Sequence, residues 1–220
     1  MTHGGFKRQF GPVFMQQMKL IGFSGTAFCY TMKTKTFLFV IDVEVNEVGH
    51  INLAFGIHPT AIKLWGHGKL HARSCELFKL LMPSVRKTHW EVGANKMQNE
   101  KLANKMFAFV HTEVLPTIAK YTTNPDILDE ILPSDLVGVA VMFDKLHGMY
   151  LKGVVCNPME AAWTLSSYYY GKHNIEHAKD FLWAGVDYIG WPHMKPIEGA
   201  DKIKKILAED LINGKFGRRK

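Results

Sequence analysis

Two neighbouring segments alternate between apolar and other residues with a period of two. Residues 36–45 and 50–58 both do so, and the four residues between them, Asn-Glu-Val-Gly, suit a turn. A period of two predicts strands that are buried on one side, so the two segments should form an antiparallel pair, which residues 26–32 extend as a third strand. The apolar positions in phase are Phe37, Phe39, Ile41, Val43 and Val45, then Ile51, Leu53, Phe55 and Ile57.

Helical periodicity flanks these strands. Gly11-Pro12 opens a stretch with 3.6-residue spacing that ends at Gly22, and proline suits the first position of a helix. Residues 95–120 carry a broad apolar stripe, which predicts a long helix that kinks or restarts near Pro116. The sequence therefore predicts an α+β fold, in which an N-terminal antiparallel sheet of three to five strands packs on two helices.

The pattern is less regular between the strands and the long helix. Residues 75–82 indicate an apolar turn or short helix, and residues 89–92 a short strand. After residue 124 the pattern is helical, with a hairpin of two helices at 159–170 and 175–189 and a last amphipathic helix at 199–212. We expect an α+β domain at 1–123 and a helical region at 124–220.

Charge is distributed unevenly along the chain. Residues 1–120 hold 15 Lys and Arg against 7 Asp and Glu, whereas residues 121–220 hold 12 against 13. The basic part could form an electrostatic surface for nucleic acid or an acidic protein. It could equally be a solvated face, because the positive residues are dispersed and form no continuous run.

Composition and cysteine usage suggest the cellular setting. No apolar run approaches the roughly 18 residues of a membrane helix, and no apolar segment near the N-terminus indicates a secretory signal. The three cysteines, Cys29, Cys75 and Cys156, are widely spaced and do not form a disulfide framework. We therefore expect a cytoplasmic protein that does not associate with membranes.

Several short motifs follow one another in an order typical of one bacterial family. The chain resembles the family called domain of unknown function 4304 over roughly residues 6–135. That resemblance implies an α+β fold, no established activity, no catalytic residue to carry over, and relatives that look like immunity or accessory proteins that bind another protein. The motifs are Leu20-Ile21-Gly22-Phe23, Tyr30, the run from Ile51 to Pro59, Cys75, His89-Trp90 and Val114-Leu115-Pro116-Thr117-Ile118.

Few residues carry a signal for catalysis. His67 and His71 have the spacing of two metal ligands on a helix, but glycines flank His67, so we predict no metal site and no cofactor. Cys156 precedes a predicted helix N-terminus, where a thiol pKa can fall, while Cys29 and Cys75 suit a core. An enzyme with a site near His67/His71 or Cys156 remains one alternative.

Two carboxylates lie near the end of a strand of the predicted hairpin. Asp42 and Glu44 share one face of their strand, close to its end. Charged residues in such a place are typical of a solvated edge that discourages aggregation. We expect both to face water.

Aromatic residues gather in the predicted helical hairpin. Three consecutive tyrosines on a helix point in different directions, so at least one should be exposed or meet another surface. The sequence favours a non-enzymatic protein-binding role, of an immunity or accessory type, with a nucleic-acid-associated protein as the first alternative. The candidate partner-binding residues are Tyr168, Tyr169, Tyr170, Trp183 and Trp191.

Overall fold

The computed structural model describes residues 3–26, 28–62, 70–84, 86–136, 138–151 and 158–188, together with 205–206, 209–210 and 213. The chain divides into two compact units. Unit 1 is Met1–His58 with Gly66–Pro125, and unit 2 is Pro59–Trp65 with Asp126–Lys220. Within the described ranges, no helix has the length and apolar character needed to cross a membrane.

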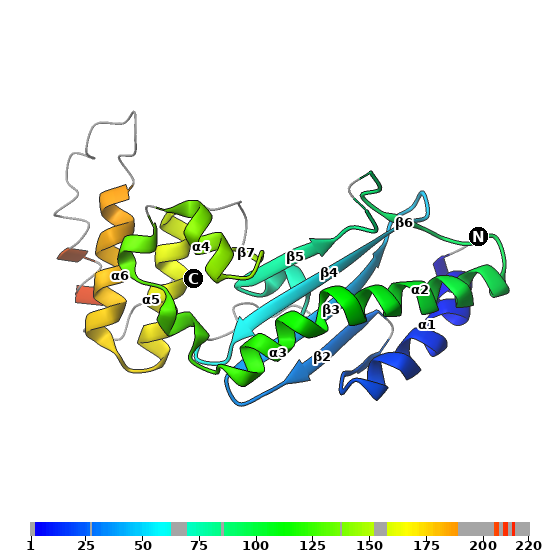
Figure 1. Cartoon of the computed structure of the whole chain (residues 1–220), viewed down its shortest axis with the longest axis horizontal. Helices are drawn as coiled ribbons and strands as arrows, with labels where there is room; N and C mark the ends of the chain where they lie inside the picture. The colour runs from blue at the N-terminus through cyan, green and yellow to red at the C-terminus, as the bar shows by residue number, and fades with distance from the viewer. Residues whose placement is uncertain are drawn as a thin grey trace. The chain divides into compact units, whose positions relative to one another are not determined.

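Unit 1 contains an antiparallel sheet (Figure 1). Its strands lie in the order β1-β2-β3-β4-β5, and β6 pairs with the beginning of β4. Residues 26–32 do not form one strand as predicted, because Phe28 has a φ of 92° and lies in a turn between β1 and β2. The strands are β1 (Ser24–Thr26), β2 (Cys29–Lys33), β3 (Phe37–Val45), β4 (His50–Pro59), β5 (Leu77–Leu81) and β6 (Trp90–Glu91).

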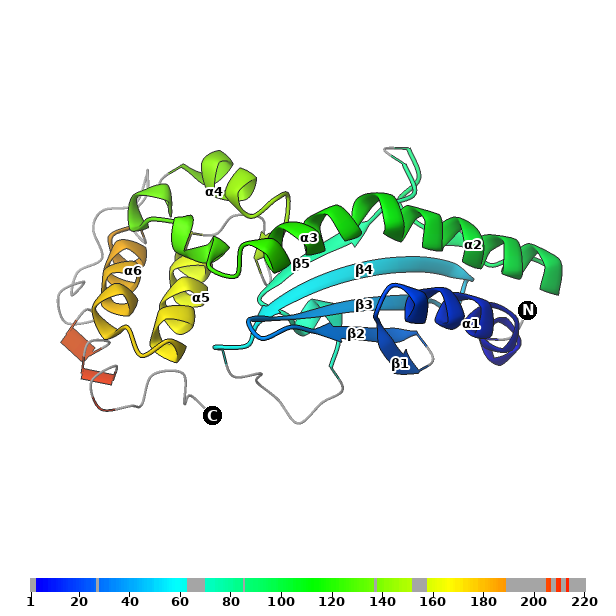
Figure 2. The same ribbon diagram turned by 60° about the horizontal axis from the view of Figure 1, so that its bottom comes forward.

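Helices cover one face of this sheet. Figure 2 shows α1 (His3–Leu20) lying beside α2 (Lys96–Glu113), with α3 (Leu115–Thr123) continuing from α2 along the strands. Phe14 of α1 packs edge-on against Tyr30 of β2, and Tyr121 of α3 packs against Phe37 of β3. The alternating apolar residues of β3 and β4 therefore face the helices, as their period predicts. The predicted α+β class, with a sheet packed on helices, is confirmed.

The first helix begins earlier than predicted. It starts at His3, and Pro12 lies inside it rather than at its first position. The reason is a row of apolar side chains at every fourth residue, all of them at most 1% exposed. Burial of four such side chains, at about 1.5–3 kcal/mol each, outweighs the roughly 3 kcal/mol cost of an interior proline. The row is Phe6, Phe10, Phe14 and Met18.

The long helical segment divides as predicted. Asn95 caps α2 by accepting a hydrogen bond from the backbone N–H of Gln98 at 3.0 Å. α2 ends at Glu113, and α3 restarts at Leu115 with Pro116 in its first turn, where proline lacks only an N–H that would be unpaired anyway. The predicted restart near Pro116 is confirmed.

The opposite face of the sheet carries a short covering segment. Residues 70–75 cross it and include the 3-10 helix η1 (Ala72–Ser74). The apolar turn or helix predicted for residues 75–82 is wrong, because Leu77–Leu81 forms β5 and pairs with Leu53–Ile57 of β4. β6 lies within the strand predicted at 89–92.

Unit 2 is mainly helical. The predicted hairpin is present as α5 and α6, and Asn174 caps α6 by accepting from the backbone N–H of His177 at 3.2 Å. Ser166 of α5 donates to the carbonyl oxygen of Ala178 of α6 at 2.7 Å. Most of the helix predicted at 199–212 lies outside the described residues. The elements are η2 (Ile127–Glu130), η3 (Pro133–Leu136), α4 (Val139–Lys145), β7 (Tyr150–Leu151), α5 (Pro158–Gly171) and α6 (Ile175–Tyr188).

Candidate functional site

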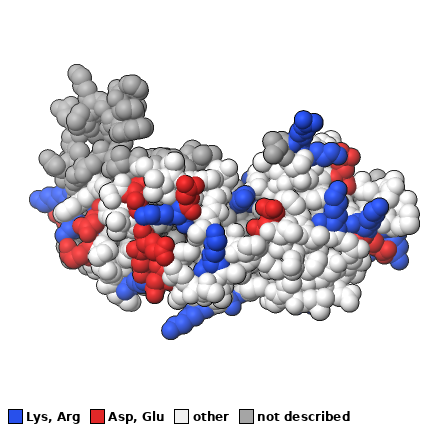
Figure 3. All heavy atoms as spheres, viewed as in Figure 1, with Lys and Arg blue, Asp and Glu red and all other residues white. Residues whose placement is uncertain are grey.

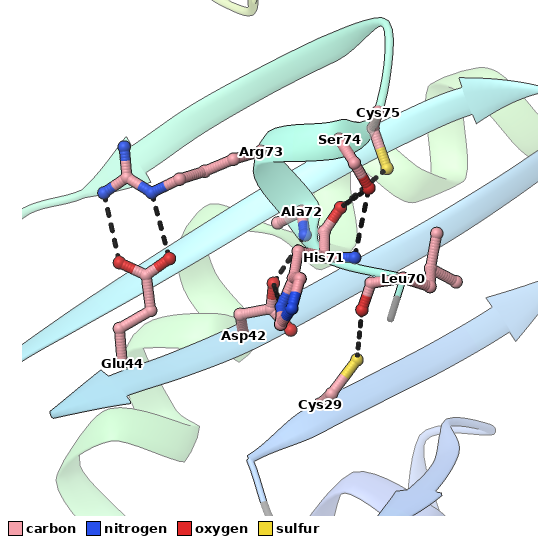
Figure 4. A network of polar contacts seen from close by, with 9 residues as sticks. All are labelled: Cys29, Asp42, Glu44, Leu70, His71, Ala72, Arg73, Ser74 and Cys75. Carbon is pink, nitrogen blue, oxygen red and sulfur yellow. Dashed lines mark hydrogen bonds and ion pairs between the residues drawn. The ribbon is translucent and has the colours of Figure 1, made fainter. Parts of the chain in front are cut away.

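Asp42 is the most buried charged residue among those that the sequence singles out. It is 2% exposed, so the predicted solvated strand edge is wrong at this position. Its Oδ2 accepts a hydrogen bond from the backbone N–H of Ala72 at 2.5 Å and lies 3.6 Å from Nδ1 of His71 (Figure 4). The carboxylate is buried because residues 70–75 lie over it, and it satisfies an amide of that segment which would otherwise be unpaired.

Glu44, two residues further along the same face, binds the same segment through a partly exposed ion pair. Its two carboxylate oxygens accept from Nε and Nη2 of Arg73 at 2.9 and 3.1 Å. This paired hydrogen bond raises the pKa of the Arg73 guanidinium above its ordinary value. Glu44 thus meets an arginine where the sequence predicted only solvent.

The segment also holds its own shape. Ser74 accepts from the backbone N–H of His71 at 3.1 Å and donates to the carbonyl oxygen of His71 at 2.6 Å. Gly56 of β4 lies directly beneath, because a Cβ there would stand 2.5 Å from the carbonyl oxygen of Ala72. We call residues 70–75 with Asp42, Glu44 and Gly56 the polar clamp.

Of the two described cysteines, Cys75 is part of this clamp and Cys29 contacts it. The thiol of Cys29 donates to the carbonyl oxygen of Leu70 at 3.3 Å, and that of Cys75 to the carbonyl oxygen of His71 at 3.7 Å. Burial, reinforced by the neighbouring Asp42 carboxylate, raises the pKa of Cys29 to about 12. A thiol in such surroundings stays protonated near neutral pH, a state that suits the hydrogen bond to Leu70 and disfavours nucleophilic attack.

The enzyme alternatives involve residues of which the structure describes only one. His67 and Cys156 both lie outside the described residues. His71 is described, and it serves as the N-cap of η1 beside Asp42. Among the residues that the structure describes, no three His, Cys, Asp or Glu side chains are placed to hold a metal ion. The polar clamp as it stands can fasten a loop to a sheet.

The aromatic residues of the helical hairpin lie mostly inside unit 2. Tyr168 is 4% exposed and Tyr169 is 5% exposed, and the ring of Tyr169 stacks on Phe181 with 5.4 Å between centroids. Tyr170 and Trp183 are half-buried, and Trp191 lies outside the described residues. In this structure Tyr168 and Tyr169 serve the packing of the hairpin, which leaves Tyr170 and Trp183 as the only accessible members of the described set.

An apolar hollow in unit 1 was missed by sequence reasoning. It encloses about 370 Å³ between the end of β5 and the outer side of α2. Leu80 and Met82 are 38% and 48% exposed there, and Phe109 is half-buried. The run Leu77–Leu81 carries apolar residues on both sides, with Lys79 as its one charged residue, and that was the available signal, because a strand with one solvated face should alternate. The hollow is lined by Lys79, Leu80, Leu81, Met82, Pro83, Ser84, Phe109 and Glu113.

The charged side chains of unit 1 form no continuous basic patch on the face shown in Figure 3. There the lysines and arginines stand singly or in small groups, with acidic residues and wide uncharged areas between them. Nucleic acid is bound by a continuous track of positive charge that follows the phosphates. This face therefore does not favour the nucleic-acid alternative.

Comparison with protein-family models, with curated proteins and with solved structures finds no match. The resemblance to domain of unknown function 4304 stays a prediction. The function of this chain is therefore inferred from its own surfaces.

Proposed function

We propose that the protein acts by binding another protein, in an immunity-type or accessory role, and that the apolar hollow receives a side chain of that partner. The observation that supports the proposal is a hollow lined by Leu81, Met82 and Phe109, beside which Met82 and the β5 residue Leu80 are 48% and 38% exposed. Exposed apolar residues that converge on a depression are typical of interaction sites, whereas scattered ones are common on any surface.

The size and chemistry of the hollow suit a single anchoring side chain. Its volume of about 370 Å³ can take one large aliphatic or aromatic group. Methionine is flexible and polarisable, so Met82 can adapt its shape to such a group. Lys79 and Glu113 line the same hollow with opposite charges, which suits a partner segment carrying one charge of each sign beside its apolar anchor.

The proposal is tested by capture from a native cell lysate with three tagged forms of the chain: wild type, Met82→Lys and Met97→Lys. Met97 lies on α2, is 73% exposed and does not line the hollow, so its substitution matches the charge change elsewhere. Capture is repeated at about 0.5 M salt, where the Debye length falls to a few Å and exposed ion pairs are screened.

We expect one protein that wild type and Met97→Lys both retain at high salt and that Met82→Lys loses. Equal retention by all three forms would show that the hollow is not the binding site. Nucleic acid that appears only at low salt, with no protein retained at high salt, would instead support the basic N-terminal region as the functional surface.

A further inference from the structure

β6 lies at one end of the sheet of unit 1 (Figure 1). A second and larger pocket is lined there by residues of β6 and of the turn between β3 and β4. It has a volume of about 610 Å³, which is within the range of roughly 300–1,000 Å³ typical of small-molecule sites. Its walls come from the turn between β3 and β4, from β6 and the residues that follow it, and from Phe6 of α1. We call it the turn pocket.

The backbone around the turn pocket is held in place by its own hydrogen bonds. Asn46 Oδ1 accepts from the backbone N–H groups of Val48 and His50 at 3.1 and 2.9 Å. On the other wall, the N–H of Val92 donates to the carbonyl oxygen of Gly49 at 3.0 Å, and that of Gly93 donates to Asn99 Oδ1 at 2.7 Å. The pocket is therefore preformed, and these four N–H groups are committed to partners within the protein.

The charge of the turn pocket is opposite to that of the chain. The protein has a net charge of +7, yet the residues that line this pocket include Glu47 and Glu91 and neither lysine nor arginine. A ligand with a negative charge would meet two carboxylates there and no amide free to receive it among the four N–H groups above. A ligand with a positive charge would be attracted by both carboxylates.

The remaining lining mixes polar and apolar residues. Val45, Val48, Val92 and Ala94 supply its apolar part, whereas Phe6 is 1% exposed and presents almost no surface. His50 also lines the pocket, and its ring stacks on that of His89 with 3.6 Å between centroids, which holds this wall in place. The three valines and Ala94 can contact a small apolar body of a ligand.

From this combination we propose that the turn pocket binds an organic cation whose apolar body carries one amidinium, guanidinium or ammonium group. Glu47 and Glu91 would face the positive group, while the valines would contact the apolar body. Both carboxylates are exposed to water, so each contributes modestly and the affinity for a small cation should lie in the millimolar range. This site is independent of the apolar hollow and of the partner proposed for it.

The test uses benzamidine as the cation and benzamide as a neutral compound of the same shape. Both are titrated into the full-length chain, and the backbone amide signals of Gly49 and Gly93 are followed by NMR. We expect benzamidine to shift both signals in a saturable way and benzamide to have little effect. Equal responses to the two compounds, or no response at Gly49 and Gly93 up to about 20 mM benzamidine, would overturn the proposal.

Three variants test whether Glu47 and Glu91 attract the cation. The double variant Glu47→Gln/Glu91→Gln should bind benzamidine at least about fivefold more weakly, whereas Glu176→Gln, an exposed site in unit 2, should bind it as wild type does. Val48→Lys places a positive charge at a residue that is 74% exposed, so it should abolish binding and leave the fold intact. Unchanged affinity in both the double variant and Val48→Lys would also overturn the proposal.

Discussion

The carboxylate of Asp42 accepts a hydrogen bond from the backbone N–H of Ala72, 30 residues further along the chain, at 2.5 Å. This bond fastens residues 70–75 to the face of the sheet that the helices leave uncovered. It also gives a buried charge a partner, and a buried charge without one would be strongly destabilising. The polar clamp is therefore expected to contribute to stability more through Asp42 than through its exposed ion pair.

We predict that Asp42→Ala lowers the free energy of unfolding by about 2–3 kcal/mol, because it leaves the amide of Ala72 buried without an acceptor. Glu44→Ala should cost less than ~1 kcal/mol, since the Glu44–Arg73 pair is partly exposed. Urea denaturation of both variants measures the difference. Equal losses would show that burial at position 42 is not what matters.

Gly56 gives a steric test of the same contact. In Gly56→Ala the new Cβ would lie 2.5 Å from the Ala72 carbonyl oxygen and 2.8 Å from Sγ of Cys75. The covering segment must move away, at a cost of about 1–3 kcal/mol. Hydrogen exchange should show faster exchange at the amide of Ala72. An unchanged rate there, with unchanged stability, would contradict the close packing of residues 70–75 on β4.

The raised pKa of Cys29 predicts a loss of stability in alkali. In the unfolded chain the thiol has its usual pKa of 9.0, and in the folded protein it titrates near 12, so the folded state holds its proton more tightly. The stability that the protonated Cys29 thiol gives to the folded state is complete below pH 9 and is lost as the pH rises toward 12. Tyr30, whose pKa burial also raises to about 12, contributes to the same fall.

Replacing Cys29 separates its contribution from that of the buried tyrosines. The urea midpoint of Cys29→Ala should fall less steeply between pH 9 and 11 than that of wild type, and the remaining fall is due to buried tyrosines such as Tyr30, Tyr121 and Tyr169, whose pKa values burial raises. Alkylation of Cys29 at pH 9, followed by mass spectrometry of its peptide, should also be on the order of 100-fold slower in the folded protein than in urea. Rapid alkylation in the folded state would identify Cys29 as a reactive thiol after all.

Strands and helices whose apolar residues recur regularly on one face could be predicted from the sequence. The alternation at 36–45 and 50–58 located β3 and β4 because one side of each strand faces the helices. The burial of the strand face that carries Asp42 could not be predicted in the same way. A strand pattern shows which residues share a face, but whether water reaches that face depends on the segment 30 residues away that covers it.

Other errors have similar physical causes. Pro12 suggested a helix start, but the burial of Phe6 and Phe10 carries the helix through it. β5 lacked a regular alternation because apolar residues occur on both of its sides, with Lys79 between them, so neither the strand nor the hollow beside it was predicted. Which tyrosine of α5 is buried depends on the packing around that helix, where Tyr169 stacks on Phe181 of α6 and Tyr168 is 4% exposed.

The burial of Tyr169 makes a prediction about the helical hairpin. Tyr169→Ala removes a ring that stacks on Phe181, and it should lower the free energy of unfolding by about 3–5 kcal/mol, the range for large aromatic residues in a core. Tyr170→Ala should cost much less, because its side chain is half-buried. Thermal unfolding of both variants gives the comparison. A fully stable Tyr169→Ala that loses partner binding would instead support the hairpin as the docking surface.

The most direct test of the protein-binding account is hydrogen exchange of the chain with and without the protein that it captures. Binding at the apolar hollow predicts slower exchange at residues 80–84 and around Phe109, with little change in α5 and α6. Slower exchange confined to the α5–α6 hairpin, with residues 80–84 unaffected, would contradict the account and locate the interface in unit 2.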